Sequence, residues 1–217
     1  MRLRNIPGAD EKIDASASVV HNPEVFIDRW ASEIFRNDRP VEVEIGCGKG
    51  MFLMEMARLH PEVNYIGIEK FSSVLVRAVE KADLEPLPNL RFLRYDAADI
   101  LNIFTPGEIA GIYLNFSDPW PKARHAKKRL THREFLAKYQ TVLAPGGLLI
   151  QKTDNEGLFD FSLEEFRAEG WEIVAETRDL HRSPMREGNV MTEFERKFTT
   201  LGKPVFKLVA KRPADVV

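Results

Sequence analysis

The strongest constraint on the fold of this sequence is its alternation of short β-branched, apolar runs with longer segments of helical periodicity. Strands are expected at residues 41–45, 64–69, 89–96, 111–117, 148–153, 171–177 and 204–210. Helices are expected at residues 51–60, 72–85, 133–143 and 163–169. Because strands that alternate with helices form βαβ units, the sequence predicts an α/β fold with a mostly parallel sheet. In such sheets, ligands bind at the carboxyl ends of the strands.

The composition limits the class of protein and its surroundings. Hydrophobic residues make up 44% and charged residues 29% of the 217 residues, which is typical of a soluble globular protein. The net charge of −2 means that any affinity for nucleic acid has to be local. A single cysteine excludes an internal disulfide, and no apolar run approaches the roughly 18 residues of a membrane span. We therefore expect a cytoplasmic protein.

The sequence also suggests a simple domain organisation. Residues 1–22 are polar, have little periodicity and are expected to form a flexible N-terminal segment. Residues 23–217 contain neither an internal repeat nor a low-complexity tract, and we expect them to form a single domain.

A glycine-rich loop, EIGCGKG at residues 44–50, follows the first expected strand. Glycines permit a tight turn and a close approach of the backbone to a ligand, although a simple strand-to-helix turn uses them too. The nicotinamide pattern G-x-G-x-x-G would require a glycine at Met51. The pattern E-x-G-x-G-x-G instead resembles the first motif of class I S-adenosylmethionine-dependent methyltransferases. Cys47, inside this loop, is interpreted as a small filler and not as a nucleophile.

Acidic residues at successive strand ends strengthen the cofactor hypothesis. Glu44 lies at the mouth of the loop, Glu69 ends the second expected strand and Asp96 ends the third. A carboxylate at the position of Glu69 can accept hydrogen bonds from both hydroxyls of a ribose. Asp96 is expected to contact the adenine amino group. The sulfonium and ammonium groups of S-adenosylmethionine favour such carboxylates, whereas solvated or helix-capping acids are the alternative.

The fourth expected strand ends in NFSDPWPKARHAKKR at residues 115–129. Its prolines restrict the backbone and would hold Asp118 at the strand tip, facing the methyl group. Residues 119–133 contain six Lys or Arg, with Arg133 included, and no acidic residue. Next to a strand end that carries chemistry, this run is expected to contact RNA phosphates, although most such runs are solvated loops.

Taken together, these motifs resemble one family, the bacterial tRNA (guanine-N7)-methyltransferases. The resemblance is carried by VEIGCGKG (43–50), NYIGIEK (64–70), NFSDPWPKARHAKKRL (115–130), TDN (153–155) and MTEFERKF (191–198). It covers about residues 40–212 in order. It implies a Rossmann-like fold, with a seven-stranded, mostly parallel sheet, helices on both faces and an antiparallel last strand. It also implies transfer of a methyl group from S-adenosylmethionine to N7 of the variable-loop guanine of tRNA, guanine 46, giving 7-methylguanosine and S-adenosylhomocysteine.

The resemblance implies a role for individual residues. The catalytic residue is Asp118, and the cofactor-binding residues are Glu44, Gly46, Gly48, Gly50, Glu69, Asp96 and Asp118. The substrate-binding residues are Lys122, Asp154, Thr192, Glu193, Phe194 and Glu195. The RNA-contacting residues are Arg124, His125, Ala126, Lys127, Lys128 and Arg129. No metal is expected, because no cluster of His, Cys and Asp has ligand spacing.

Two of these segments also match a helix-capping pattern, S/T-x-x-E. Thr192 and Glu195 match it before a helix that would end near Gly202, and Thr153 and Glu156 match it as well. Capping and substrate binding both remain open for these residues.

The chemistry of guanine limits the mechanism. N7 has a lone pair in the neutral base, so we expect an in-line displacement driven by positioning and electrostatics, without a general base. Asp118 would stabilise the positive charge that develops on the base. Asp154, Glu193 or Glu195 could accept hydrogen bonds from guanine N1–H and the amino group, and the sequence does not choose among them.

Two other functions remain as alternatives. One is a non-catalytic RNA-binding protein on a methyltransferase-like scaffold, which the four acids at strand ends disfavour. The other is a methyltransferase for an exocyclic amine, because the rigid turn is similar to the Asp/Asn-Pro-Pro-aromatic motif of amino-methyltransferases. The basic run and the TEFE segment at residues 192–195 argue against this second alternative. The sequence leaves a monomer and a homodimer equally open.

Overall fold

The computed structural model describes residues 6–214. Its seven strands follow the order β3-β2-β1-β4-β5-β7-β6 in one sheet. β2 is parallel to β1 and β3, β4 is parallel to β5, and β7 is antiparallel to β5 and β6. This order confirms the predicted α/β fold class with a mostly parallel sheet. The chain divides into two compact units, Met1–Thr105 and Pro106–Val217. The prediction of a single domain over residues 23–217 stays a prediction.

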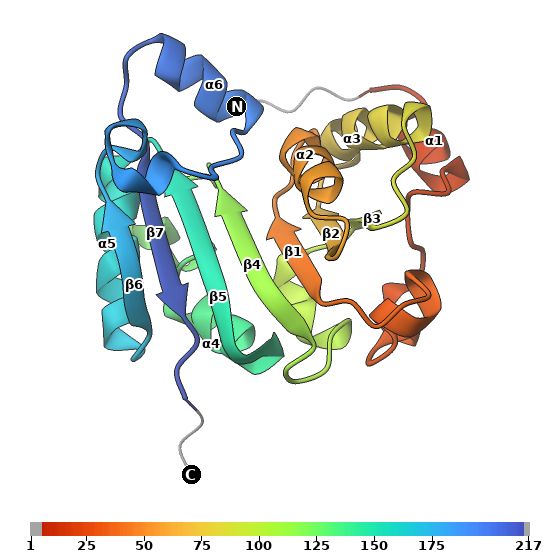
Figure 1. Cartoon of the computed structure of the whole chain (residues 1–217), viewed down its shortest axis with the longest axis horizontal. Coiled ribbons are helices and arrows are strands. Elements are labelled where there is room, and N and C mark those ends of the chain that lie inside the picture. The colour runs from red at the N-terminus through yellow and green to blue at the C-terminus, as the bar shows by residue number, and fades with distance from the viewer. Residues whose placement is uncertain (1–5, 215–217) are drawn as a thin grey trace. The chain divides into compact units, whose positions relative to one another are not determined.

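The first unit contains a parallel βαβαβ arrangement (Figure 1). Its elements are β1 (Val41–Ile45), α2 (Met51–Leu59), β2 (Asn64–Glu69), α3 (Ser72–Leu84), β3 (Leu90–Arg94) and the short 3₁₀ helix η3 (Ala97–Asn102). β2 pairs in parallel with both β1 and β3, and every residue of β2 is buried. A central parallel strand is covered on both faces, which agrees with the apolar residues at positions 65–68.

Before β1, the first unit has short helices that the sequence pattern did not predict. Helix α1 (Ala9–Ala15) lies beside α3 and buries Ala9 and Ile13 (Figure 1). Further along come η1 (Pro23–Phe26) and η2 (Trp30–Ile34), and buried Trp30 donates a hydrogen bond to the carbonyl of Ile103 at 2.7 Å. The described part of the expected flexible segment is therefore partly helical, while residues 1–5 lie outside the described residues. The flexibility itself stays a prediction.

The second unit combines two parallel strands with an antiparallel pair. Its elements are β4 (Ile109–Asn115), η4 (Ala123–Lys128), α4 (Arg133–Val142), β5 (Leu143–Thr153), α5 (Glu156–Ala168), β6 (Glu172–Thr177), η5 (Leu180–Arg182), η6 (Pro184–Arg186), α6 (Glu193–Thr200) and β7 (Phe206–Lys211). β7 lies between β5 and β6 and is antiparallel to both (Figure 1). This position agrees with the expected antiparallel last strand.

Two boundaries in the second unit differ from those expected. β5 starts at Leu143, because Ile109 pairs with Leu143 and the register then shifts so that Gly111 pairs with Leu148. The shift accommodates the Pro-Gly-Gly segment that was expected to lie outside the strand. Helix α5 starts seven residues earlier than expected, at residue 156 instead of 163.

The start of α5 also corrects a capping prediction. The side chain of Asn155 caps this helix by accepting a hydrogen bond from the Leu158 amide at 2.8 Å. Thr153 instead accepts a hydrogen bond from the Asn155 amide at 3.1 Å. The capping box suggested for Thr153 and Glu156 is therefore wrong, because Asn155 occupies the cap position itself.

Candidate active site

The glycine loop after β1 adopts a backbone that favours glycine at three alternate positions. Gly46, Gly48 and Gly50 have φ values of 73°, 60° and 72°, in the left-handed region that L side chains rarely adopt. The Gly46 amide donates to the carbonyl of Ile68 on β2 at 2.8 Å. A Cβ atom at Gly50 would lie only 2.8 Å from the Cβ of Ala78. The backbone conformation thus favours glycine at all three positions, and close packing also requires it at Gly50.

Two predicted carboxylates accompany this loop. Glu69, the last residue of β2, accepts hydrogen bonds from the Gly48 amide at 3.2 Å and from the Phe71 amide at 3.0 Å. Glu44 is buried and pairs in register with Gly67, so it lies on the strand next to that of Glu69. The loop therefore fixes Glu69 at the carboxyl end of the strands, as predicted for a cofactor site.

Asp96 lies two residues beyond the end of β3, and not within the strand as expected. Its Oδ1 accepts a hydrogen bond from the Ala98 amide at 3.0 Å and so caps η3. Its Oδ2 accepts a hydrogen bond from Nζ of Lys70, and this contact raises the pKa of Lys70. Lys70 was not predicted as a site residue, although it ends one of the motif stretches. Together these contacts hold Asp96 in one orientation.

Cys47 behaves as a packing residue. Its side chain is buried, and a Cβ atom at Gly67 would approach its Sγ to 2.9 Å. Burial raises the pKa of the Cys47 thiol well above its ordinary value, and the nearby Glu44 and Glu69 raise it further. A thiol that resists ionisation is a poor nucleophile, which agrees with the interpretation of Cys47 as a filler.

The turn that carries Asp118 follows β4 and is strained on both sides of the aspartate. Phe116 and Trp120 have φ values of 53° and 42°, which is unusual for aromatic residues. The guanidinium of Arg129 donates from Nε to the Pro119 carbonyl at 3.0 Å and from Nη2 to the Trp120 carbonyl at 3.1 Å. Arg129 thus holds the turn closed, while Asp118 itself is exposed.

The basic segment folds as η4 around the ring of Trp120. His125 meets this ring edge-on, with centroids 5.7 Å apart, and Nζ of Lys128 lies 4.8 Å from the ring centroid. The indole thus packs inside the turn and is engaged by a cation. Trp120 itself is half-buried and does not belong to the buried core.

The other members of the basic segment differ in their surroundings. Lys122 and Arg124 are exposed at the start of η4, whereas Ala126 is half-buried. Nζ of Lys127 pairs with Oε1 of Glu134 at 2.6 Å, in an exposed ion pair that solvent screens. The cations at the surface of η4 therefore remain accessible to a polyanion, whereas Arg129 is committed to the turn.

Asp154 lies directly after β5 and is exposed. In the parallel register of β4 and β5, Asn115 pairs with Lys152, and the Phe116 amide donates to the Lys152 carbonyl at 2.8 Å. Asp118 and Asp154 therefore follow adjacent strand ends of the second unit. The structure brings together these two predicted residues within one unit.

Helix α6 starts at the predicted TEFE segment and presents an aromatic ring to solvent. The ring of Phe194 is 54% exposed and lies in a cluster with Phe116 and Phe198. The three ring centroids are 6.2–6.4 Å apart and their planes differ by only 11–22°. The same segment brings the exposed Glu193 to this surface. The ring cluster is a face on which a planar base could stack.

Glu195 lies in the interior, unlike its neighbours in the TEFE segment. It forms a capping box with Thr192, which confirms the capping pattern, and α6 ends at Thr200, close to the expected end. Its side chain is 0% exposed and pairs at 2.7 Å with Nζ of Lys152, which is 2% exposed. Asn189 Nδ2 donates to its other oxygen at 2.6 Å. Contacts inside the protein thus hold both oxygens of this carboxylate.

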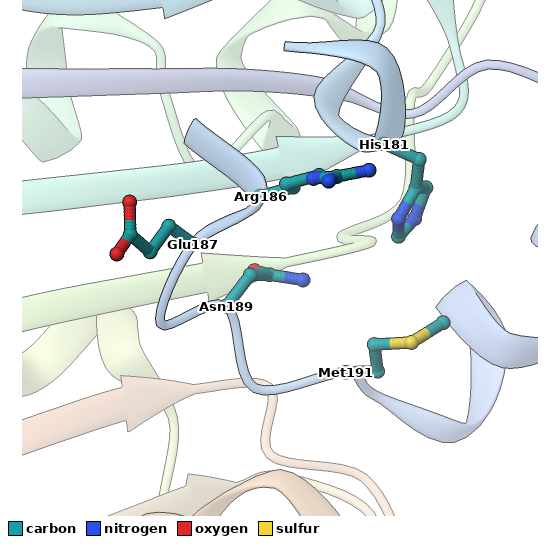
Figure 2. A pocket seen from close by; sticks show the side chains of 5 residues that line it. All are labelled: His181, Arg186, Glu187, Asn189 and Met191. Carbon is teal, nitrogen blue, oxygen red and sulfur yellow. The ribbon is translucent and has the colours of Figure 1, made fainter. Parts of the chain in front are cut away.

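A hollow of about 450 Å³ adjoins this network and was missed by the sequence analysis (Figure 2). It is lined by His181, Arg186, Glu187, Asn189 and Met191. These residues lie between β6 and α6, in a stretch without regular periodicity. Only the cations of HRSPMRE (181–187) could have drawn attention to it in the sequence. Among residues 6–214, no group of three His, Cys, Asp or Glu side chains is placed to hold a metal ion.

Comparisons with known proteins assign the chain to a family. Residues 38–208 match the family described as "Putative methyltransferase". The tRNA (guanine-N(7)-)-methyltransferases of Lachnoclostridium phytofermentans and Bacillus subtilis are 53% and 45% identical to the chain. The matches cover 99% and 95% of this chain and 100% and 97% of those proteins.

Solved structures show the same fold at low sequence identity. The 16S rRNA methyltransferase KamB matches 86% of this chain and 94% of its own, with a TM-score of 0.65 and 15% identity. A 16S rRNA (adenine(1408)-N(1))-methyltransferase variant from Catenulisporales acidiphilia, solved with S-adenosylmethionine, matches 91% and 94% with a TM-score of 0.60 and 18% identity.

The fold, the glycine loop and the matched family define a class I methyltransferase that depends on S-adenosylmethionine. Within this class, the similarity over nearly the full length of curated relatives is decisive. The chain belongs to the tRNA (guanine-N7)-methyltransferase family.

Proposed function

We propose that this chain transfers a methyl group from S-adenosylmethionine to N7 of guanine 46 in the variable loop of tRNA. The products are 7-methylguanosine in the tRNA and S-adenosylhomocysteine. The observation that carries the proposal is the clamped turn that presents Asp118 directly before the basic segment η4. The names of the close relatives support the same reaction. The soluble-type composition and single cysteine support a cytoplasmic location.

The residues of the first unit fit the cofactor. The left-handed glycines leave room for a ligand against the backbone, and the hydrogen bond from the Gly48 amide orients Glu69. We propose that Glu69 accepts hydrogen bonds from the ribose hydroxyls and that Asp96 accepts one from the adenine amino group. Glu44 is proposed to attract the ammonium group of the cofactor. When it is bound, S-adenosylmethionine supplies a methyl group made electrophilic by its sulfonium.

Asp118 is proposed to act on the base. The N7 lone pair attacks without prior loss of a proton, and the imidazole ring of guanine becomes positively charged. A carboxylate held in place beforehand stabilises this charge more in the transition state than in the ground state, which accelerates transfer. The clamp from Arg129 and the flanking strained residues supply the required rigidity.

The edge of the guanine is proposed to meet acidic groups of the second unit. Asp154 and Glu193 are exposed and are suited to accept hydrogen bonds from guanine N1–H and its amino group. The exposed ring of Phe194 offers a face for stacking. Thr192 and Glu195 are proposed to contribute by positioning this segment, because both are buried and the side chain of each accepts a hydrogen bond from the backbone amide of the other.

The tRNA backbone is proposed to contact the surface of η4. Lys122, Arg124, His125, Lys127 and Lys128 provide charges for phosphates, with Ala126 between them. Arg129 contributes by fixing the turn.

The test is a methyl-transfer assay with purified protein, labelled S-adenosylmethionine and unmodified tRNA. Nucleoside analysis and strand scission at 7-methylguanosine then locate the methyl group. A label at N7 of guanine 46 is expected. A label on another atom or another RNA would preserve the methyltransferase class but reject the proposed substrate.

A further inference from the structure

We propose that the hollow between β6 and α6 binds a phosphodiester group of the tRNA, at a place separate from η4. This inference rests on the proposed function and extends it to a second contact with the RNA. Its central residues are Arg186 and His181.

The side chains of the hollow are arranged for an anion. Figure 2 shows the guanidinium of Arg186 directed toward His181, whereas the carboxylate of Glu187 points away from both. Arg186 is exposed, and among residues 6–214 its side chain forms no ion pair with an acid. A guanidinium that forms no ion pair can bind a phosphate through two parallel hydrogen bonds.

Of the two acids at the hollow, Glu187 points away from Arg186 and Glu195 is already paired. Nε2 of His181 lies 3.3 Å from Oε1 of Glu195, but Oε2 of the same carboxylate pairs with Lys152 at 2.7 Å. The hydroxyl of Thr199 lies 3.0 Å from the same ring nitrogen and further orients the imidazole. Neither acid forms an ion pair with Arg186.

Hydrogen bonds hold both ends of the segment 180–190, which carries most of the residues that line the hollow. At one end, the amide of buried Leu180 donates to the Val205 carbonyl at 2.8 Å. At the other end, Nζ of Lys152 donates to the Val190 carbonyl at 2.8 Å. A site that is ordered before binding loses less conformational entropy when it takes its ligand.

The size of the hollow agrees with part of a nucleotide. Its volume of about 450 Å³ exceeds the needs of a phosphate alone and is within the roughly 300–1,000 Å³ of ligand sites. The thioether of Met191 forms an apolar wall that suits a ribose next to the phosphate. An RNA backbone therefore fits better than an isolated inorganic anion.

The experiment compares Arg186→Gln with Arg182→Gln in the full chain. Arg182 is a matched control, because it lies on the same loop, its side chain is 88% exposed and it has only a 3.7 Å contact with Asp179. The affinity for unmodified tRNA is measured by filter binding at several salt concentrations. The KM for S-adenosylmethionine and the kcat at saturating tRNA are measured in parallel, and circular dichroism checks folding.

We expect Arg186→Gln to weaken tRNA binding about five- to tenfold and to reduce the slope of log K against log salt by about one. Arg186→Lys should lie between it and the unchanged protein, because lysine keeps the charge but loses the fork. Arg182→Gln should stay within about twofold of the unchanged protein.

Two results would overturn the inference. Equal tRNA affinities for the two glutamine variants would show that the hollow does not contact RNA. If Arg186→Gln raises the KM for S-adenosylmethionine and leaves the tRNA affinity unchanged, the hollow binds the carboxylate of the cofactor and not a phosphate of the tRNA. Failure of the proposed function would appear as an absence of 7-methylguanosine with the unsubstituted protein. The two failures can be told apart because tRNA binding is measured without methyl transfer.

Discussion

At the scale of single residues, Asp118 gives the most direct test of the mechanism. Asp118→Asn removes the negative charge but keeps the size of the side chain on the clamped turn. We expect kcat to fall about 10- to 100-fold, because electrostatic stabilisation is lost while N7 keeps its own lone pair. Single-turnover methylation of tRNA measures this change. Complete loss of transfer with intact tRNA binding would indicate instead that the charge of Asp118, or a proton transfer by it, is obligatory.

Arg129 and Arg124 have the same charge but different surroundings, which makes them a matched pair. Arg129→Lys keeps the charge and loses the fork that holds the Pro119 and Trp120 carbonyls. We expect a roughly tenfold lower kcat and an unchanged salt dependence of tRNA binding.

The exposed Arg124 serves as the comparison. Arg124→Gln should leave kcat nearly unchanged and reduce the salt slope by about one. A nearly unchanged kcat for Arg129→Lys would contradict the role of the fork in holding the turn, and an unchanged salt slope for Arg124→Gln would show that Arg124 does not contact the RNA.

These residues also show what the sequence could predict about the site. Glycines with left-handed backbone and acids at strand ends follow from local pattern, and Gly48 and Glu69 occupy the expected places. The partners of a charged side chain depend on which distant segments meet. For this reason, the clamp from Arg129 and the interior position of Glu195 could not be inferred from residue type and spacing.

At the scale of secondary-structure elements, a buried ion pair joins α6 to β5. Glu195→Gln would leave Lys152 charged and buried without a carboxylate. We expect a loss of about 3 kcal/mol in the free energy of unfolding, because removal of one partner leaves the other uncompensated. Urea denaturation measures it. A loss below about 1 kcal/mol would show that water or neighbouring groups replace the pair, and Glu193→Gln on the exposed face serves as the control.

A second ion pair, between α4 and α5, should make stability depend on pH. Hydrogen bonds from the Arg133 side chain lower the pKa of Glu165 below its ordinary value of 4.5. Because the pKa is depressed in the folded state, the stabilisation is present above about pH 4.5 and is lost as the pH falls below it.

The test of this pH dependence uses Arg133→Gln. It should lower the free energy of unfolding at pH 7 only slightly, since Arg133 is largely exposed and solvent screens its charge. The difference from the unsubstituted protein should shrink on acidification below pH 4.5, which thermal melts at several pH values can follow. Arg167→Gln, in the exposed pair with Glu176, provides the control. A constant difference across this pH range would contradict the assignment.

The boundaries of helices and strands show how far sequence periodicity can predict secondary structure. β2 was predicted at its observed bounds, because its short apolar centre at residues 65–68 is typical of a buried strand. Helix α1 is only seven residues long, so its pattern covers barely two turns. Helix α5 starts at residue 156 because Asn155 caps it. The capping pattern that begins at Thr153 would place the start two residues earlier.

At the scale of the whole molecule, the distribution of charge matters more than its sum. The chain has a net charge of −2, yet cations gather in η4 and around Arg186. We expect tRNA affinity to fall steeply between 50 and 200 mM salt, whereas binding of S-adenosylmethionine should change little. Parallel titrations of the two ligands check this. A flat salt response for tRNA would mean that shape and base contacts supply nearly all of the affinity.

The buried carboxylate of Glu195 has a consequence for how this enzyme can diversify. The same side chain completes the capping box at the start of α6, next to the exposed Phe194. It also lies 3.3 Å from Nε2 of His181 at the edge of the hollow. A change that adapts one of these surfaces to a different RNA would therefore disturb the other. Variation in substrate preference should then arise through paired substitutions on both sides of this carboxylate, while the carboxylate itself stays unchanged.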